Sequence, residues 1–164
     1  MDRDLANAWD PAEAAEPAKA GEPSGSGEAV LVRPGHTYEG KQGLTYGEGI
    51  FSGNAGAQRL CLHTLRIPPG GRATAHLHAS HETAIYLVAG TATVLHGPDL
   101  ARRTEMQPGD FLYIPADCPH VPINTGDLEA FAVLARTDPN EQESVVLLPT
   151  LEALVEERRR QGGA

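Results

Sequence analysis

Two histidines, His76 and His78, are separated by a single residue in a stretch that runs from Gly70 to Gly90. On a β-strand, residues i and i+2 project to the same face, so both imidazole rings can point to one place. Neutral imidazole is a common ligand of transition metals. The pair therefore predicts two ligands of a metal site whose remaining ligands lie further along the chain.

The candidates for the remaining ligands lie in two places. His81 and Glu82 follow the pair within the same stretch, and His120 lies in a second stretch that runs from Gly109 to Asn124. The other histidines are scattered along the chain: His36, His63 and His96. We interpret these scattered histidines as core or surface residues without a metal-binding role.

Length and charge limit the kinds of partner that we expect. The chain has 164 residues, the size of one domain, and its 13 Lys and Arg against 22 Asp and Glu give a formal net charge of −9. An acidic surface repels phosphate groups, so we expect no nucleic-acid partner. No apolar run approaches the roughly 18 residues of a membrane span, so we expect no membrane partner. Two isolated cysteines without an export signal indicate a cytoplasmic protein.

Composition divides the chain into three parts. Residues 1–28 carry seven acidic and two basic side chains among Ala, Pro, Gly and Ser, so we expect a disordered tail that is dispensable for folding. Residues 29–148 hold short apolar segments separated by turn-forming residues, which is typical of strands. Residues 149–164 are expected to form a C-terminal helix and tail, with Thr150 as the N-cap.

The middle part predicts an antiparallel sandwich or barrel. We expect strands at residues 29–33, 60–65, 111–115, 120–124 and 129–136, and two more strands within 83–97 that are hinged near Gly90. No helical period of useful length interrupts them, and the many short strands indicate an all-β fold.

The two histidine-bearing stretches resemble the paired motifs of the cupin superfamily, G-x5-H-x-H-x3,4-E-x6-G and G-x5-P-x-G-x2-H-x3-N. The matching residues are Gly70, His76, His78 and Glu82 in the first motif and Gly109, Pro115, His120 and Asn124 in the second. The resemblance covers roughly residues 58–136 and is greatest to small single-domain RmlC-like bacterial cupins. It implies a single-domain antiparallel β-barrel, the double-stranded β-helix of jelly-roll type, with a short C-terminal helix.

The resemblance also implies a metal site. By analogy with most cupins, His76, His78, Glu82 and His120 would bind one divalent transition metal, and Glu82 would in addition move protons during catalysis. A set of histidines with or without a carboxylate suits Fe, Mn, Zn, Ni or Cu, and the sequence does not choose among them.

Two departures from the motifs bear on this site. Asp117 stands where the second motif has Gly, and we expect the turn to survive because Asp tolerates left-handed backbone geometry. Seven residues separate Glu82 from Gly90 where six are usual, so counting back from Gly90 puts Thr83 in the carboxylate position.

Two site models follow from that count. In the preferred model, a bulge near residues 79–80 turns Glu82 inward, and it joins His76, His78 and His120 as a ligand. In the other model, strand parity turns His81 inward with Thr83, so that three or four histidines bind the metal and Glu82 supports them.

The expected function is that of a metal-dependent enzyme, of oxygenase or isomerase type, which acts on a small molecule held in the barrel. One alternative is a non-catalytic module that binds or senses a small molecule. A weaker alternative is an accessory role in a biosynthetic pathway, since related cupins occur fused to a synthetase-like domain in enzymes that join two nitrogens.

Two further expectations concern the surroundings of the site. The polar run of residues 136–144 could close over the barrel mouth, with Arg136 holding a carboxylate or a phosphate of the substrate. The resemblance also implies a homodimer, because cupins often pair through sheet edges and N-terminal strands, where an open barrel leaves edges that need covering. The glycine-rich segment 40–53 suits such pairing.

Overall fold

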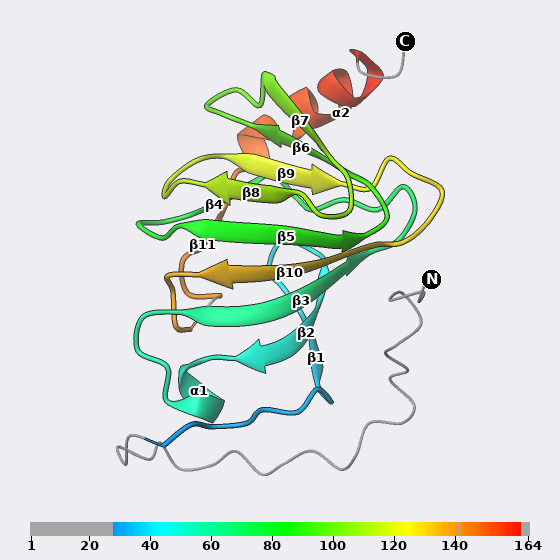
Figure 1. Cartoon of the computed structure of the whole chain (residues 1–164). Helices are drawn as coiled ribbons and strands as arrows, with labels where there is room; N and C mark the ends of the chain where they lie inside the picture. Colours follow the sequence, from blue (N-terminus) through cyan, green and yellow to red (C-terminus); the bar gives the residue numbers. More distant parts are fainter. Residues whose placement is uncertain (1–27, 141, 162–164) are drawn as a thin grey trace, which may run out of the picture.

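The computed structural model describes residues 28–140 and 142–161. Within this part of the chain, eleven strands form two antiparallel sheets that face each other (Figure 1). The all-β prediction is therefore confirmed. Except for Glu28, the expected tail of residues 1–28 lies outside the described residues, so the expectation about it stays a prediction.

The two sheets differ in strand number. The six-stranded sheet contains, in spatial order, β1 (Thr37–Glu39), β2 (Thr45–Ile50), β3 (Cys61–Ile67), β10 (Ala130–Arg136), β5 (Thr83–Ala89) and β8 (Phe111–Ile114). The five-stranded sheet contains β11 (Val145–Leu147), β4 (His76–His78), β9 (His120–Ile123), β6 (Ala92–His96) and β7 (Arg102–Met106). Strands that are distant in sequence thus become neighbours, and β4 with its two histidines lies beside β9.

The helical elements are short. The C-terminal helix α2 (Glu152–Gln161) follows a 3₁₀ turn at Pro149–Leu151, so Thr150 lies within that turn and is not the N-cap. The four-residue helix α1 (Ser52–Ala55) is not predicted from the sequence. Its start is capped by the Asn54 side chain, which accepts a hydrogen bond from the Phe51 N–H. No helix in the described part of the chain is both long and apolar enough to cross a membrane.

The strand predictions hold best where apolar residues alternate. The segment 83–97 forms β5 and β6, with the expected hinge at Gly90. Gly90 has a φ of 72°, and a Cβ there would lie 2.4 Å from the Glu129 carbonyl oxygen, so glycine is required on two counts.

The predicted strand at 29–33 does not form. Val30 and Leu31 are exposed, and pairing in this region begins only at Thr37, opposite Gly47. In contrast, β7 is a strand that the sequence pattern does not predict, because three of its five residues are charged. Polar residues of this kind are common on a sheet edge, where β7 lies.

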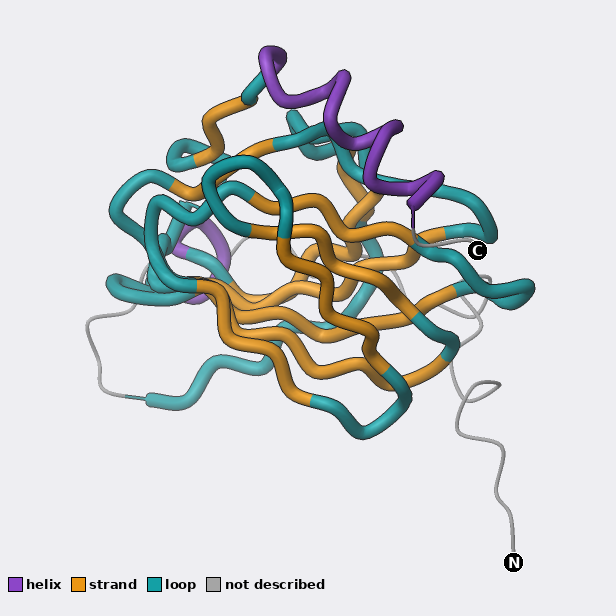
Figure 2. The backbone as a smooth tube through the Cα atoms, turned by 90° about the horizontal axis from the view of Figure 1, so that it is seen from above, coloured by secondary structure: helices purple, strands orange, loops and turns teal. Residues whose placement is uncertain are grey.

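Strand alternation produces two apolar cores. The core between the sheets includes Leu65, Leu87 and Val94, whereas Leu95, the next residue on β6, belongs to a second core on the outer side of the five-stranded sheet. Helix α2 covers this second core through Val155, and it lies along one side of the molecule in the view from above (Figure 2). The inner strands β6 and β9 are therefore buried on both faces, whereas the edge strands β7 and β11 keep exposed side chains.

We predict that the contact between α2 and the five-stranded sheet is a major source of stability. Leu95→Ala should lower the free energy of unfolding by about 2–5 kcal/mol, since it opens a cavity beneath the helix. Leu128→Ala is the matched control, because Leu128 is 75% exposed, and it should change the free energy by no more than about 0.5 kcal/mol. Urea titration of both variants measures the difference, and equal effects would contradict the role assigned to this core.

Candidate metal centre

Three histidines meet inside the barrel, as their spacing predicts. His76 on β4 and His120 on β9 are directly opposite each other across the pair of strands, and His78 lies two residues along β4. Their rings are 4.3 to 5.7 Å apart between centroids. One ligand nitrogen from each of the three lies within 4.8 Å of the others, so this histidine triad can hold a metal ion. All three side chains are buried.

Hydrogen bonds at Nδ1 orient two of the rings. The Nδ1 atom of His76 is 2.8 Å from the Thr74 carbonyl oxygen, and that of His120 is 2.9 Å from the Cys118 carbonyl oxygen. A carbonyl only accepts, so Nδ1 carries the proton in both rings and the Nε2 lone pair is left available. Such contacts are typical of metal-binding histidines.

The third ring gives the strongest sign that a cation fits here. The Nδ1 atom of His78 lies 3.3 Å from the Ser144 hydroxyl. Its Nε2 atom is buried and has no hydrogen-bond partner among the described residues. A buried polar atom without a partner costs about 1–3 kcal/mol, and a metal ion would satisfy it.

The triad is uncharged at neutral pH. Burial lowers the pKa of His120 to about 4, although its hydrogen bond to the Cys118 carbonyl acts in the opposite direction. Burial likewise holds the pKa of His76 and of His78 well below the ordinary value. The positive charge of Arg136 lowers the pKa of all three further. Neutral imidazole is the form that binds metals.

The structure does not bring Glu82 to the triad. From Thr83 to Tyr86, β5 pairs with β10 and β8 in continuous register, and Thr83 is buried on the inner face. Glu82 therefore has the opposite parity: it is exposed, and its Oε1 atom accepts a 2.6 Å hydrogen bond from the Tyr113 hydroxyl. This position differs from that of the preferred sequence model, which needs an inward-facing Glu82.

His81 does not join the triad either. It is only partly buried, and its Nδ1 atom lies 3.4 Å from the Thr137 hydroxyl. The triad group therefore contains neither Glu82 nor His81. The count back from Gly90 correctly predicts that Thr83 faces inward. The alternation of side chains does not extend into the turn before β5, so His81 does not face inward with Thr83.

That turn joins the two sequence motifs. Ser80 has a φ of 61°, and its N–H donates a 3.0 Å hydrogen bond to the Asp117 side chain. Asp117 itself has a φ of 60°, so the expectation that Asp keeps the left-handed turn is confirmed. The Asp117 N–H in turn donates to the carbonyl of His78. This contact holds residues 79–81 in the turn, and β5 then starts with Thr83 facing inward.

Polar residues of the six-stranded sheet face the triad from the other side. Arg136 and Thr83 are partners across β10 and β5, and both are buried. The Thr83 hydroxyl has no hydrogen-bond partner among the described residues. The guanidinium carbon of Arg136 lies 5.7 Å from the centre of the Tyr46 ring, and the Gln42 amide donates to the Tyr46 hydroxyl.

Some of these neighbours could not be found from the sequence. Gln42 lies in the turn between β1 and β2, a position without any pattern that indicates a buried side chain. His96 is directly opposite His120, and its Nε2 atom is 3.0 Å from the Thr104 hydroxyl. Strand parity with Val94, a residue of the inner core, could have indicated that His96 faces inward.

The polar run after Arg136 packs against this end of the barrel. The Asp138 carboxylate accepts from the N–H groups of Asn140 and Ser144. Ser144 then contacts His78, and its carbonyl accepts from the Ala79 N–H. The described residues of the run thus support the triad from outside the sheets.

Comparison with known proteins gives a consistent result. A family model described as a cupin domain matches residues 63–135, which include all three triad histidines. A search of curated proteins finds no match.

Solved structures resemble the chain over most of its length. The polyketide cyclase RemF from Streptomyces resistomycificus is 26% identical with a TM-score of 0.54, and the match covers 74% of this chain and 79% of that one. The oxalate decarboxylase of Lactobacillus farciminis, solved as a formate complex, is 28% identical with a TM-score of 0.59, over 69% of this chain but only 33% of that one. The Bacillus subtilis oxalate decarboxylase, at 22% identity and a TM-score of 0.58, supports the fold alone.

We predict that the metal-free protein loses stability in mild acid because of the triad. The unfolded chain takes up protons near pH 6.5, whereas the folded state excludes them until about pH 4 at His120. The free energy of unfolding should therefore fall as the pH decreases below 6.5, by up to about 1.4 kcal/mol per pH unit for each histidine. Urea titrations in EDTA between pH 7 and 5 measure this slope. His120→Gln should reduce it and exposed His36→Gln should not, and equal slopes in all three proteins would contradict the prediction.

Proposed function

The chain belongs to the cupin superfamily, and on that premise we propose that it is a metal-dependent enzyme acting on a small molecule inside the barrel. The observation that carries the proposal is the convergence of three buried, neutral imidazoles from two neighbouring strands. A structural histidine cluster without a metal would leave the buried Nε2 atom of His78 without a partner.

The donor set restricts the metal to a class. Three imidazole nitrogens suit one divalent transition ion, Fe, Mn, Zn, Ni or Cu, and are a poor site for Mg or Ca, which prefer oxygen. When bound, such an ion supplies Lewis-acid chemistry, or redox chemistry in the case of Fe or Cu. Oxygenase chemistry needs a redox-active ion such as iron or copper, whereas isomerase chemistry is open to zinc or manganese.

The residues of this chain would do the remaining work. His76, His78 and His120 would hold the ion, with their rings oriented by the contacts at Nδ1. The apolar core between the sheets would exclude water from the reacting groups. The proposed ligand set differs from the sequence model in one residue, because Glu82 points to the outer surface and bonds to Tyr113.

Catalysis is favoured over simple ligand binding by the related structures. Of the three structures named above, the two that are more than 25% identical are described as a cyclase and a decarboxylase, and the cyclase matches this chain over most of both lengths. The chain spans only a third of the decarboxylase, so we transfer neither reaction as such. A binding or sensing module is the alternative, and it would hold the same ion without turnover of any ligand.

Alanine variants test the ligand set. His76→Ala, His78→Ala and His120→Ala should each abolish tight metal binding, since each removes one of three ligands. Glu82→Ala, His81→Ala and the control His36→Ala should keep the wild-type metal content. Elemental analysis of untagged, dialysed protein gives the stoichiometry.

Two results would contradict the proposed ligand set. A loss of metal in Glu82→Ala equal to that in the histidine variants would restore Glu82 as a ligand. Wild-type metal content in all the variants would show that the triad is structural, and the proposal of a metal enzyme would fail.

We also propose that the protein is a homodimer that pairs through the outer face of the six-stranded sheet. This sheet exposes four large apolar side chains, on β3, β5 and β8: Leu62, Tyr86, Phe111 and Tyr113. The same face holds a cavity of about 470 Å³ lined in part by Leu62, Phe131 and Val133.

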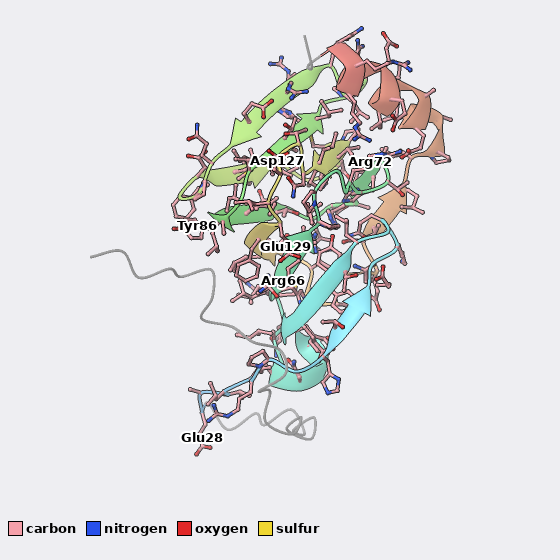
Figure 3. The ribbon with its side chains drawn as sticks, turned by 90° about the vertical axis from the view of Figure 1, so that its right-hand side faces the viewer. Glu28, Arg66, Arg72, Tyr86, Asp127 and Glu129 are labelled. Carbon is pink, nitrogen blue, oxygen red and sulfur yellow. The ribbon has the colours of Figure 1, made fainter. Side chains whose placement is uncertain are left out.

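The size and charge of this face suit a second copy. Six strands about 4.8 Å apart and up to seven residues long give a face of roughly 600–700 Å², close to the about 800 Å² per partner of a standard interface. Arg66 and Glu129 form an ion pair on this sheet (Figure 3). A face that carries both charges can pair with itself about a two-fold axis.

Light scattering tests the dimer. The wild-type protein should have about twice the monomer mass of 17.4 kDa at micromolar concentration. Phe111→Asp should shift the mass to that of the monomer, because it places a charge in the apolar face. Val146→Asp is the control, since Val146 is exposed on β11 of the other sheet, and it should leave the dimer intact. A wild-type mass near 17.4 kDa would exclude the dimer.

A further inference from the structure

We propose that the ligand of this site is a small carboxylate, held by the guanidinium of Arg136 and the hydroxyl of Thr83 beside the histidine triad. The inference rests on the proposed metal centre and specifies what binds next to it. It is carried by two side chains that the metal would not use.

The first observation is the position of the two side chains. Arg136 and Thr83 are directly opposite on neighbouring antiparallel strands, so their side chains lie next to each other on the inner face. Their exposed fractions are 4% and 2%. The positive charge of Arg136 acts on all three histidines, which places the guanidinium within electrostatic reach of the whole triad.

The second observation is the charge of the site. A divalent ion on three neutral imidazoles keeps its full charge of +2, and Arg136 adds a further positive charge. No carboxylate belongs to the triad group among the described residues, because Glu82 lies on the outer face. A positively charged buried site binds an anion better than a neutral molecule.

The third observation is the Thr83 hydroxyl, which is buried without a hydrogen-bond partner among the described residues. A ligand oxygen would satisfy it. Arg136 makes contacts within the protein, but its five N–H donors allow it to donate to a ligand as well.

These donors fit a carboxylate better than a phosphate. The guanidinium fork and the hydroxyl can satisfy the two oxygens of a carboxylate, one of which would also face the ion. A phosphate brings additional oxygens and charge, whereas the guanidinium fork and the single Thr83 hydroxyl match the two oxygens of a carboxylate. We therefore expect small carboxylates to bind and phosphate to bind more weakly.

The experiment uses the full chain loaded with Co²⁺, whose visible absorption reports on ligands added at the metal. Glycolate should change the spectrum saturably, whereas its neutral analogue glycolamide and inorganic phosphate should bind at least about tenfold more weakly. Arg136→Met should weaken glycolate binding about 10- to 100-fold and Thr83→Val about 3- to 10-fold, at unchanged Co²⁺ content. Arg66→Met removes an arginine from the outer face of the same sheet and should have no effect.

The outcomes separate this inference from the proposed function. Failure of the wild-type protein to bind one Co²⁺ at the triad would contradict both the proposed metal centre and the carboxylate ligand. One bound Co²⁺ with no response to glycolate, an equal response to glycolamide, or tighter binding of phosphate would overturn the carboxylate alone. Wild-type affinity in Arg136→Met would do the same. Should Arg136→Met not fold, Arg136→Lys and Thr83→Val provide the same comparison, since neither keeps the full set of donors.

Discussion

The two-residue period of the strands decides which side chains meet inside this barrel. It turns His76 and His78 to the same side of β4, and the pairing of β4 with β9 brings His120 opposite them. The same rule places Thr83 and Arg136 on the facing surface of the other sheet. The polar end of the barrel is therefore a direct consequence of strand register, and a shift of one residue in any of these strands would replace the site by its outward-facing neighbours.

Burial then determines the protonation state of the three histidines that the strand register brings together. Three imidazoles in an apolar interior cannot hold protons easily, and each proton added would also repel the charge of Arg136. The backbone carbonyls of Thr74 and Cys118 keep protons on the Nδ1 atoms and leave Nε2 for another partner. The free protein therefore buries polar atoms at some cost to its stability, as the partnerless Nε2 atom of His78 shows. Binding of an ion would remove that cost, which links occupancy of the site to stability of the fold.

The parts of the site that follow from local patterns could be predicted from the sequence. The spacing of His76 and His78, the second motif with His120, and the hinge at Gly90 all appear in the structure as expected. The choice between an inward and an outward Glu82, which the two site models left open, could not be made in this way. It depends on the turn between β4 and β5, which is held by the Ser80 contact with Asp117, a residue 37 positions further along the chain. The burial of Gln42 could not be predicted for a similar reason, because a turn residue becomes buried only through the packing of distant strands.

The exclusion of Glu82 changes the electrostatics of the centre. A carboxylate ligand would cancel one charge of a divalent ion inside the barrel, whereas a threonine hydroxyl in its place cancels none. The compensating charge must then come from solvent, from the supporting loops or from the ligand itself. Because the triad is buried and Arg136 adds to the positive charge, the binding energy of an anionic ligand at the proposed metal-loaded triad would be greater than at a centre with a carboxylate ligand. The replacement of one inward-facing residue thus affects the choice of ligand as well as the coordination of the ion.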